Sequence, residues 1–361
     1  MKDKKINMAL RVAAFVLAIC LALSLAACKK GSDVPLTPGL SLVQGVPIYD
    51  EDVAMKTDHF VITPGMMAYF FYSYGAAVMA QMESEIPFDE SKNLHEQMYH
   101  ETLSWYDAIM NATLEKVTKL LILCEEGLSQ NVTLTEQQQE AIEQALAAYR
   151  MDAVVSYGVS LEEYLKAMYG PLMTEADMRL VLEMETFANF YSQTLSDRLE
   201  EGITDAKVQE YLAGLSKRDD TPSRHIAFLF IAFENGVPAT QKIEAVEAEM
   251  RISPSAATLQ ALEEYGTYAV EENLTPENSG IEKLAEWLFA DGRRIGDWER
   301  IDVEGATYIL LYTANGISYS EVNARMALYD AAYAEWYNSW VEKLTFGYNY
   351  ECLDGYDTAS K

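Results

Sequence analysis

The chain has 361 residues and a formal net charge of −29 at pH 7, and half of its residues are hydrophobic. This composition excludes a disordered chain, and the acidity argues against binding to nucleic acid or to anionic lipid headgroups, because the protein's field repels phosphates. The length is sufficient for two domains of ordinary size.

The N-terminus has the pattern of an export signal. Three lysines and an arginine precede an uncharged run over residues 12–27, which ends in Leu-Ala-Ala before Cys28. As a helix this run would reach about 24 Å, short of a hydrocarbon core of about 30 Å, so an uncleaved membrane anchor is the weaker alternative. Leu-Ala-Ala-Cys also resembles the bacterial lipobox. That resemblance implies that residues 1–27 are a signal peptide and that Cys28 carries a lipid.

Residues 28–47 predict a flexible linker, because glycine, serine and proline recur in them without a periodic apolar face. We expect a globular part that stands outside the cytoplasm, tethered to the outer face of the cell membrane. The lipobox and linker together suit a Gram-positive surface. Beyond Cys28, Cys124 and Cys352 remain, and two buried free thiols are favoured over a single bridge.

Residues 48–221 predict a mostly helical domain. Thr63-Pro64 is typical of a helix start, and residues 94–127 form a long amphipathic run. Three further helix starts pair a hydroxyl with an acid or amide three residues later, at Thr135, Ser160 and Thr174.

The first of these helices is rich in methionine and aromatic residues. One hypothesis is a soft surface that binds unfolded client chains, formed by Met66, Met67, Phe70, Phe71 and Tyr74. The alternative is the buried face of a core helix, which is the more common role of such a stripe.

The pattern changes at Pro222. Residues 223–231 predict a buried strand, residues 241–251, 256–265 and 281–290 predict helices, and two further strands are predicted around Glu304-Gly305. Residues 319–344 then read as one long helix. The order predicts an α+β fold, in which a small domain with an antiparallel sheet (222–316) interrupts a helical protein that ends in a helix and tail (317–361).

Several sequence motifs, and the order in which they occur, resemble the extracytoplasmic foldases of the PrsA and SurA type. Residues 135–165 and 202–212 are similar to the family's helical chaperone domain, and Ser223-Arg-His-Ile is similar to its first parvulin strand, usually Ala-Arg-His-Ile. Gly305-Ala-Thr-Tyr-Ile is similar to the last parvulin strand. The resemblance covers roughly residues 47–350. It implies a parvulin-type peptidyl-prolyl isomerase module inserted in a helical chaperone domain, on which the C-terminal helix packs.

The resemblance also locates where isomerase chemistry should be. Rotation about an X–Pro bond has a barrier of about 18–20 kcal/mol, so a catalyst must hold the amide twisted and desolvated between polar groups. The family uses two facing histidines, of which this chain has only His225; Tyr308 stands at the second position, and the family's glycine-rich loop is missing. Either His225 and Tyr308 serve an active isomerase, or both are structural in a degenerate module. The second alternative is favoured.

No cofactor and no metal are expected. The other histidines, His59, His95 and His100, lack metal-ligand spacing, and no nucleotide-binding or hydrolase motif occurs. The favoured hypothesis is a membrane-anchored chaperone whose partners are unfolded or nascent secreted proteins. An active peptidyl-prolyl isomerase and a substrate-binding or surface lipoprotein unrelated to folding are the alternatives.

Overall fold

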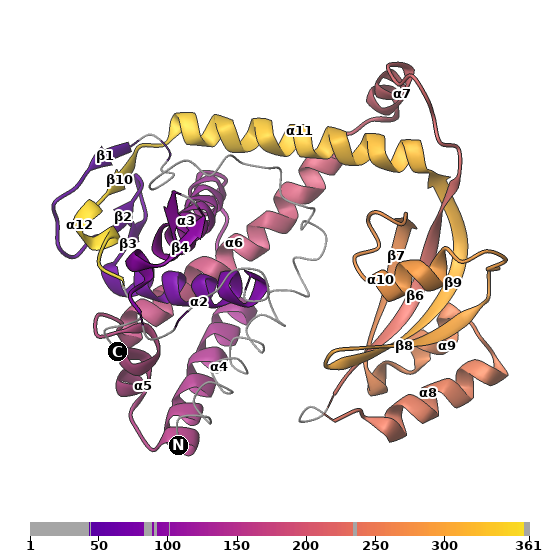
Figure 1. Cartoon of the computed structure of the whole chain (residues 1–361), viewed down its shortest axis with the longest axis horizontal. Coiled ribbons are helices and arrows are strands. Elements are labelled where there is room, and N and C mark those ends of the chain that lie inside the picture. Colours follow the sequence, from indigo (N-terminus) through magenta and orange to yellow (C-terminus); the bar gives the residue numbers. More distant parts are fainter. Residues whose placement is uncertain are drawn as a thin grey trace. The chain divides into compact units, whose positions relative to one another are not determined.

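The computed structural model describes Val43 and residues 45–82, 89, 92–100, 102–233 and 237–356. These residues form two compact units, coloured along the chain in Figure 1. The first takes its described residues from Gly31–Glu201 and Ala332–Lys361, and the second from Gly202–Ala331. The chain therefore leaves the first unit, builds the second and returns. The predicted signal, Cys28 and most of the predicted linker lie outside the described residues.

The body of the first unit is helical. Its helices are α2 (Pro64–Met82), α3 (Trp105–Ser129), α4 (Glu136–Asp152), η2 (Ala153–Tyr157), α5 (Leu161–Tyr169), α6 (Glu175–Glu201), α12 (Tyr350–Leu353) and the C-terminal part of α11 (Tyr319–Lys343). Capping boxes at Thr135 and Ser160 begin α4 and α5, and Thr174 exchanges hydrogen bonds with Asp177 at the start of α6. These helix starts are confirmed, because each cap depends only on residues within one turn.

The predicted helix over residues 94–127 is wrong at its beginning. Residues Leu94–Glu96 form a short 3-10 turn (η1), and β4 (Met98–His100) and β5 (Leu103–Ser104) form a hairpin before α3. The cause is a capping box in which Ser104 and Asp107 satisfy each other's backbone N–H groups, so the helix begins at Trp105.

A small sheet brings the two chain segments of the first unit together. Its order is β1 (Gly45–Pro47), β10 (Phe346–Tyr348), β2 (Met55–Lys56) and β3 (Val61–Ile62). β1 runs parallel to β10, with Gly45 opposite Phe346, and Figure 1 shows the two strands side by side. The last three residues of the predicted linker therefore belong to the folded unit.

The carboxylate of Glu126 joins the returning helix to the others. Glu126 is 5 % exposed; its Oε1 accepts a hydrogen bond from Arg198 Nη2 of α6 at 2.8 Å, and its Oε2 accepts one from Trp336 Nε1 of α11 at 2.5 Å. Trp336, Trp340 and Leu344 belong to the same hydrophobic core as α2, α3 and α6. One buried charge thus satisfies polar groups on two helices that are far apart in the sequence.

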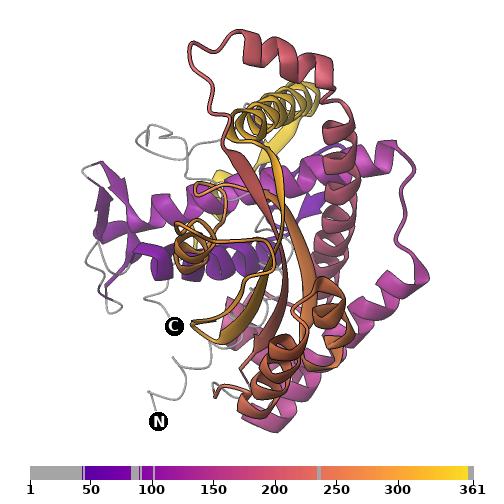
Figure 2. The same cartoon turned by 90° about the vertical axis from the view of Figure 1, so that its right-hand side faces the viewer.

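The second unit is a four-stranded antiparallel sheet in the order β7 (Thr267–Leu274), β6 (Pro222–Ala232), β9 (Ala306–Ser318) and β8 (Trp298–Val303). Side chains alternate along β6, so the sheet has two apolar faces. Ala227, Leu229 and Ile231 pack against α8 (Thr240–Ile252) and α9 (Ala256–Ala261), while Ile226 packs with α10 (Glu282–Leu288). Figure 2 shows the sheet nearly edge-on with helices on both sides.

The predicted α+β fold with an inserted antiparallel module is confirmed. The second unit also includes α7 (Asp205–Ala213), whose Val208 and Leu212 pack on Ala324 of α11. Cys124 is buried and Cys352 is half-buried, and both are free thiols. Within the described ranges, no helix combines the length and the hydropathy needed to cross a bilayer.

Replacing Glu126 with alanine is expected to lower the free energy of unfolding of the first unit by about 2–3 kcal/mol. The change removes one partner of a partly buried charge pair and leaves the Trp336 indole N–H without an acceptor. Urea unfolding followed by tryptophan fluorescence measures the effect. Glu143→Ala is the matched control, since Glu143 pairs with Arg179 on the exposed surface and its loss should hardly move the transition. Equal shifts in the two variants would contradict the anchoring role of Glu126.

Candidate functional site

His225 lies on β6, the strand that pairs with both β7 and β9. Both neighbouring strands depart from regular pairing at this point, with register shifts between Arg224 and Ile226 against β7 and between His225 and Ile226 against β9. Bulges of this kind bend a strand and re-aim its side chains, and they are frequent beside functional sites. The position of His225 is therefore the most irregular part of the sheet.

The bulge in β7 directs Asn273 toward His225. Asn273 has a φ of 56°, in the left-handed region that asparagine tolerates better than most residues. Its Oδ1 lies 3.2 Å from the backbone nitrogen of Ile317 and 3.2 Å from His225 Nε2. A backbone N–H can only donate, so the amide oxygen must face it, and His225 Nε2 must carry the proton that it donates to the same oxygen.

The other ring nitrogen of His225, Nδ1, lies outside this network. Nδ1 faces Glu272 Oε1 at 3.9 Å, and the side chain of His225 is 20 % exposed. Ser223 is fully buried beside it and donates a hydrogen bond to the carbonyl of Ile317 at 2.7 Å. The cluster of Ser223, His225 and Asn273 with the backbone of Ile317 cross-links β6, β7 and β9.

The cluster is closed on one side by a glycine. A Cβ on Gly316 would overlap Asn273 Oδ1, His225 Nε2 and Ser223 Oγ. The polar side chains therefore occupy the space that any other residue at this position would need. No room for a substrate amide remains on this side of the imidazole.

The structure does not bring Tyr308 and His225 together. His225 pairs with Ala314 across β6 and β9, whereas Tyr308 pairs with Phe230, five residues farther along β6. At about 3.3 Å per residue, the two backbone positions are about 16 Å apart. The two residues that the isomerase alternative needs together therefore lie apart on the sheet.

Tyr308 instead belongs to an aromatic cluster. Its ring lies 5.6 Å from that of Phe228 and 5.2 Å from that of Phe230, and burial raises the pKa of its hydroxyl. This is the ordinary packing of a strand tyrosine in a half-buried position.

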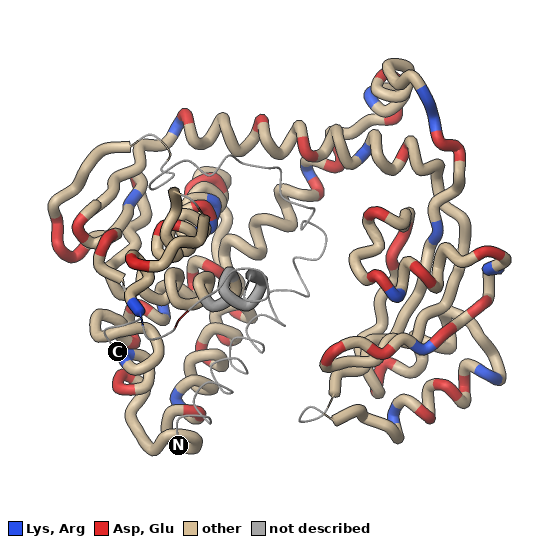
Figure 3. Tube along the Cα trace, in the orientation of Figure 1, with Lys and Arg blue, Asp and Glu red and all other residues tan. Residues whose placement is uncertain are grey.

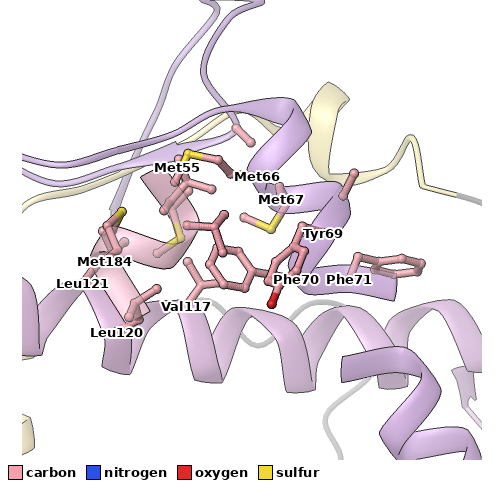
Figure 4. Close-up of a cluster of buried hydrophobic side chains, with 14 of the residues drawn as sticks. Met55, Met66, Met67, Tyr69, Phe70, Phe71, Val117, Leu120, Leu121 and Met184 are labelled. Atoms are coloured by element: carbon pink, nitrogen blue, oxygen red, sulfur yellow. The ribbon is translucent and has the colours of Figure 1, made fainter. Parts of the chain in front are cut away.

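The predicted client-binding stripe is also corrected. Met66, Met67 and Phe70 are completely buried, and Phe71 is 1 % exposed. Figure 4 shows Met66, Met67 and Phe70 beside Val117 and Leu121 of α3 and Met184 of α6. The ring of Phe71 points away from these residues and packs against Tyr106 at 5.2 Å and Tyr356 at 5.7 Å. Tyr74 is half-buried, and its ring stacks on Phe70 at 5.9 Å. Met66, Met67, Phe70 and Phe71 thus lie in the core of the first unit, and of the five residues only Tyr74 keeps part of its surface exposed.

Sequence reasoning found His225 but missed the residues that engage it. A glycine inside a predicted strand, such as Gly316, indicates a bulge or a close approach. The predicted strand that follows Gly305 covers residues 306–313 and leaves Gly316 out, whereas β9 continues to Ser318. Asn273 carries no such signal, since its role depends on a bulge that tertiary pairing creates. Across the residues that the structure describes, no group of three histidine, cysteine or acidic side chains could hold a metal ion.

No family model and no curated protein matches the chain. Among solved structures, PrsA of Bacillus subtilis is similar at 14 % identity and a TM-score of 0.32, covering 71 % of this chain and 93 % of that one. The foldase protein PrsA of Streptococcus pneumoniae has 12 % identity, a TM-score of 0.28 and coverages of 68 % and 88 %. A SurA-like chaperone of Campylobacter jejuni has 10 % identity, a TM-score of 0.22 and coverages of 82 % and 98 %. These solved structures are of the PrsA and SurA type that the sequence resemblance names.

Gly316→Ala is expected to destabilise the second unit by about 1–3 kcal/mol, because the added methyl group must displace the polar cluster. Hydrogen exchange of the amides of β6 and β9, followed by mass spectrometry, measures the loss. Gly214→Ala is the control, since Gly214 has a φ of −79° and its added Cβ would lie 3.4 Å from the nearest atom, the carbonyl oxygen of Tyr211. Unchanged protection in Gly316→Ala would show that the cluster has more space than the structure indicates.

Proposed function

We propose that this protein is an extracytoplasmic chaperone that assists the folding of secreted proteins, and that its parvulin-like unit has lost isomerase activity. The observation that carries the proposal is the engagement of His225 in an internal hydrogen-bond network with no second catalytic group beside it. The unit then contributes structure to the chaperone.

The chaperone part of the proposal is supported by the organisation of the chain. A helical unit is interrupted by an α+β unit with its own core and is completed by the end of the chain. This is the order that the resemblance to PrsA- and SurA-type foldases predicts. A module inserted in this way retains its fold independently of whether it retains its chemistry.

The loss of isomerase activity is supported by the geometry around His225. A twisted-amide catalyst needs polar groups that face the same peptide unit. Opposite His225 stands Ala314, whose methyl group cannot donate or accept a hydrogen bond, and Tyr308 is about 16 Å away along the sheet. Nε2 is already engaged by Asn273. Only Nδ1 of His225, which lies beside Glu272, remains for a substrate, and one ring nitrogen does not make a catalytic pair.

The mechanism that we propose needs no chemistry and no cofactor. Client segments bind transiently through burial of their exposed apolar side chains, which is non-directional and tolerates varied sequences. Figure 3 shows acidic residues spread over both units. With a net charge of −29 this surface keeps the chaperone soluble and favours clients with basic segments.

We also propose a lipid on Cys28 that tethers the protein to the outer face of the cell membrane. The support is the sequence alone, namely the basic start, the uncharged run and the Leu-Ala-Ala-Cys exit. A single acyl chain binds a membrane only reversibly, and stable anchoring needs a second chain or a second membrane signal. We therefore propose that Cys28 carries more than one acyl chain.

The chain is expected to leave the relaxation rate of a cis-prolyl peptide unchanged. A protease-coupled assay with a short proline peptide measures this rate, at increasing concentrations of the chain and of its His225→Ala variant. Acceleration that disappears in His225→Ala would establish the alternative function, an active isomerase.

The chain is expected to suppress the aggregation of a reduced, unfolded secreted protein at equimolar ratio. Light scattering during reduction of lysozyme, a basic client, measures the effect, and an inert acidic protein of similar size is the control. Undiminished scattering at several-fold excess of the chain would remove the chaperone proposal.

A further inference from the structure

The solvent-facing side of α4 changes character along the helix. Ile142, Leu146 and Ala153 form its buried side. On the opposite side, the first half carries glutamate and glutamine, whereas positions 147, 148, 151, 154 and 155 are Ala, Ala, Met, Val and Val, all exposed. Their spacing of three and four residues places them on one helix face. A surface helix normally carries polar residues there.

The exposure is largest where α4 runs into a π-helical turn. Met151 is 66 % exposed, Val154 63 % and Val155 77 %. The turn η2 covers Ala153–Tyr157, buries only Ala153 and ends at Gly158 with a φ of 69°. Figure 1 shows this end of α4 at the lower edge of the first unit, where the chain turns toward α5.

Folding does not account for these residues. Exposed valines lower helix propensity because their χ1 freedom is restricted, and they contribute little buried area here. π-turns within helices are frequently found at functional sites. We call Met151, Val154, Val155 and the partly exposed Tyr157 the tip patch.

Negatively charged residues lie next to the tip patch in the sequence. Asp152 follows Met151 directly and accepts hydrogen bonds from Ser156 Oγ at 2.6 Å and from Tyr164 Oη at 3.1 Å, which hold its carboxylate at this end of α4. The backbone N–H of Ser160 donates to Glu163 at 2.9 Å, and this bond lowers the pKa of Glu163. The carboxylate is therefore ionised at neutral pH.

The nearby cations do not neutralise these acidic residues. Residues 150–175 contain four carboxylates and two cations. Arg150 pairs with Glu175, and Lys166 Nζ lies 2.6 Å from Glu162. Asp152 and Glu163 therefore remain available to attract a positive charge on a partner.

We propose that the tip patch binds apolar client segments that carry lysine or arginine next to their hydrophobic residues. This inference rests on the proposed chaperone function and names the surface and the client class that it uses. The acidic residues disfavour the other occupants, because they repel both a second copy of this chain and the anionic headgroups of a membrane.

The test compares peptide binding by the full chain and by a tip variant, Met151→Ser with Val154→Ser and Val155→Ser. The probe is a fluorescent peptide with an apolar core flanked by lysines, and its counterpart has the same core flanked by glutamates. The native chain is expected to bind the lysine-flanked peptide at least tenfold more tightly at low salt, and the tip variant to lose at least tenfold of that affinity. Binding by the tip variant within twofold of the native chain would overturn the proposal, as would equal affinity for both peptides.

Two further variants keep the test specific. Val237→Ser with Ile252→Ser removes side chains that are 62 % and 78 % exposed in the second unit, and this control should bind like the native chain. Met151→Lys retains a long side chain but adds a positive charge next to Asp152, so it should weaken binding of the lysine-flanked peptide and strengthen binding of the glutamate-flanked peptide. Circular dichroism establishes that each variant is folded; a Met151→Lys chain with native peptide preference would overturn the charge argument.

Aggregation suppression separates this inference from the proposed function. If the native chain and the tip variant protect the client equally, the chaperone function stands and the tip patch is not its client surface. If the native chain gives no protection but the tip patch still binds the peptide, the peptide site stands and the chaperone function falls. Loss of a dimer in the tip variant, seen by light scattering, would assign the patch to a second copy. Loss of co-sedimentation with phosphatidylglycerol vesicles would assign it to a membrane, and either result overturns the proposal.

Discussion

The first unit depends on one buried carboxylate. Glu126 on α3 accepts hydrogen bonds from Arg198 on α6 and from Trp336 on α11. In the sequence, α6 precedes the inserted unit and this part of α11 follows it, so one carboxylate joins both segments. Desolvating a carboxylate is costly unless it is paired and hydrogen-bonded, and here both oxygens are engaged. The arrangement gives the C-terminal segment a specific docking position, whereas apolar contacts alone would tolerate a shift of the helix along its axis. A specific position for α11 then places β10 where β1 and β2 can pair with it.

In the second unit, the side chain of His225 links strands of the sheet. His225 donates to Asn273, and the same amide oxygen accepts the backbone N–H of Ile317, so three strands are held at a point where their ladders are interrupted. Bulges leave backbone groups without their regular partners, and side chains that satisfy them stabilise the irregular geometry. The hydrogen bonds of His225 and Asn273 therefore stabilise the sheet where its pairing is interrupted.

The sequence predicted those features of the fold that depend on neighbouring residues. The starts of α4, α5 and α6 follow from hydroxyl caps, and the strand at Ser223–Ile231 and the final helix follow from apolar periodicity. β7 was missed, because its exposed residues Val270, Glu271 and Glu272 lack the alternation of a half-buried strand. The candidate site could be predicted only in part. The local motif Ser223-Arg-His-Ile indicated His225. The distance to Tyr308 and the contact with Asn273 depend on strand register and bulges, which only tertiary pairing determines.

The parallel pairing of β1 with β10 bears on the order in which this protein acquires its structure. Gly45 and Phe346 are partners from segments that precede and follow the inserted unit in the sequence. The second unit has its own hydrophobic cores, so it can collapse before β1 meets β10 and before the helical unit gains its tryptophan-bearing helix. Closing so long a loop is entropically costly and slow, and a folded insert shortens the free chain that must be closed. We therefore expect the insert to fold first and the strand pair that spans it to form last.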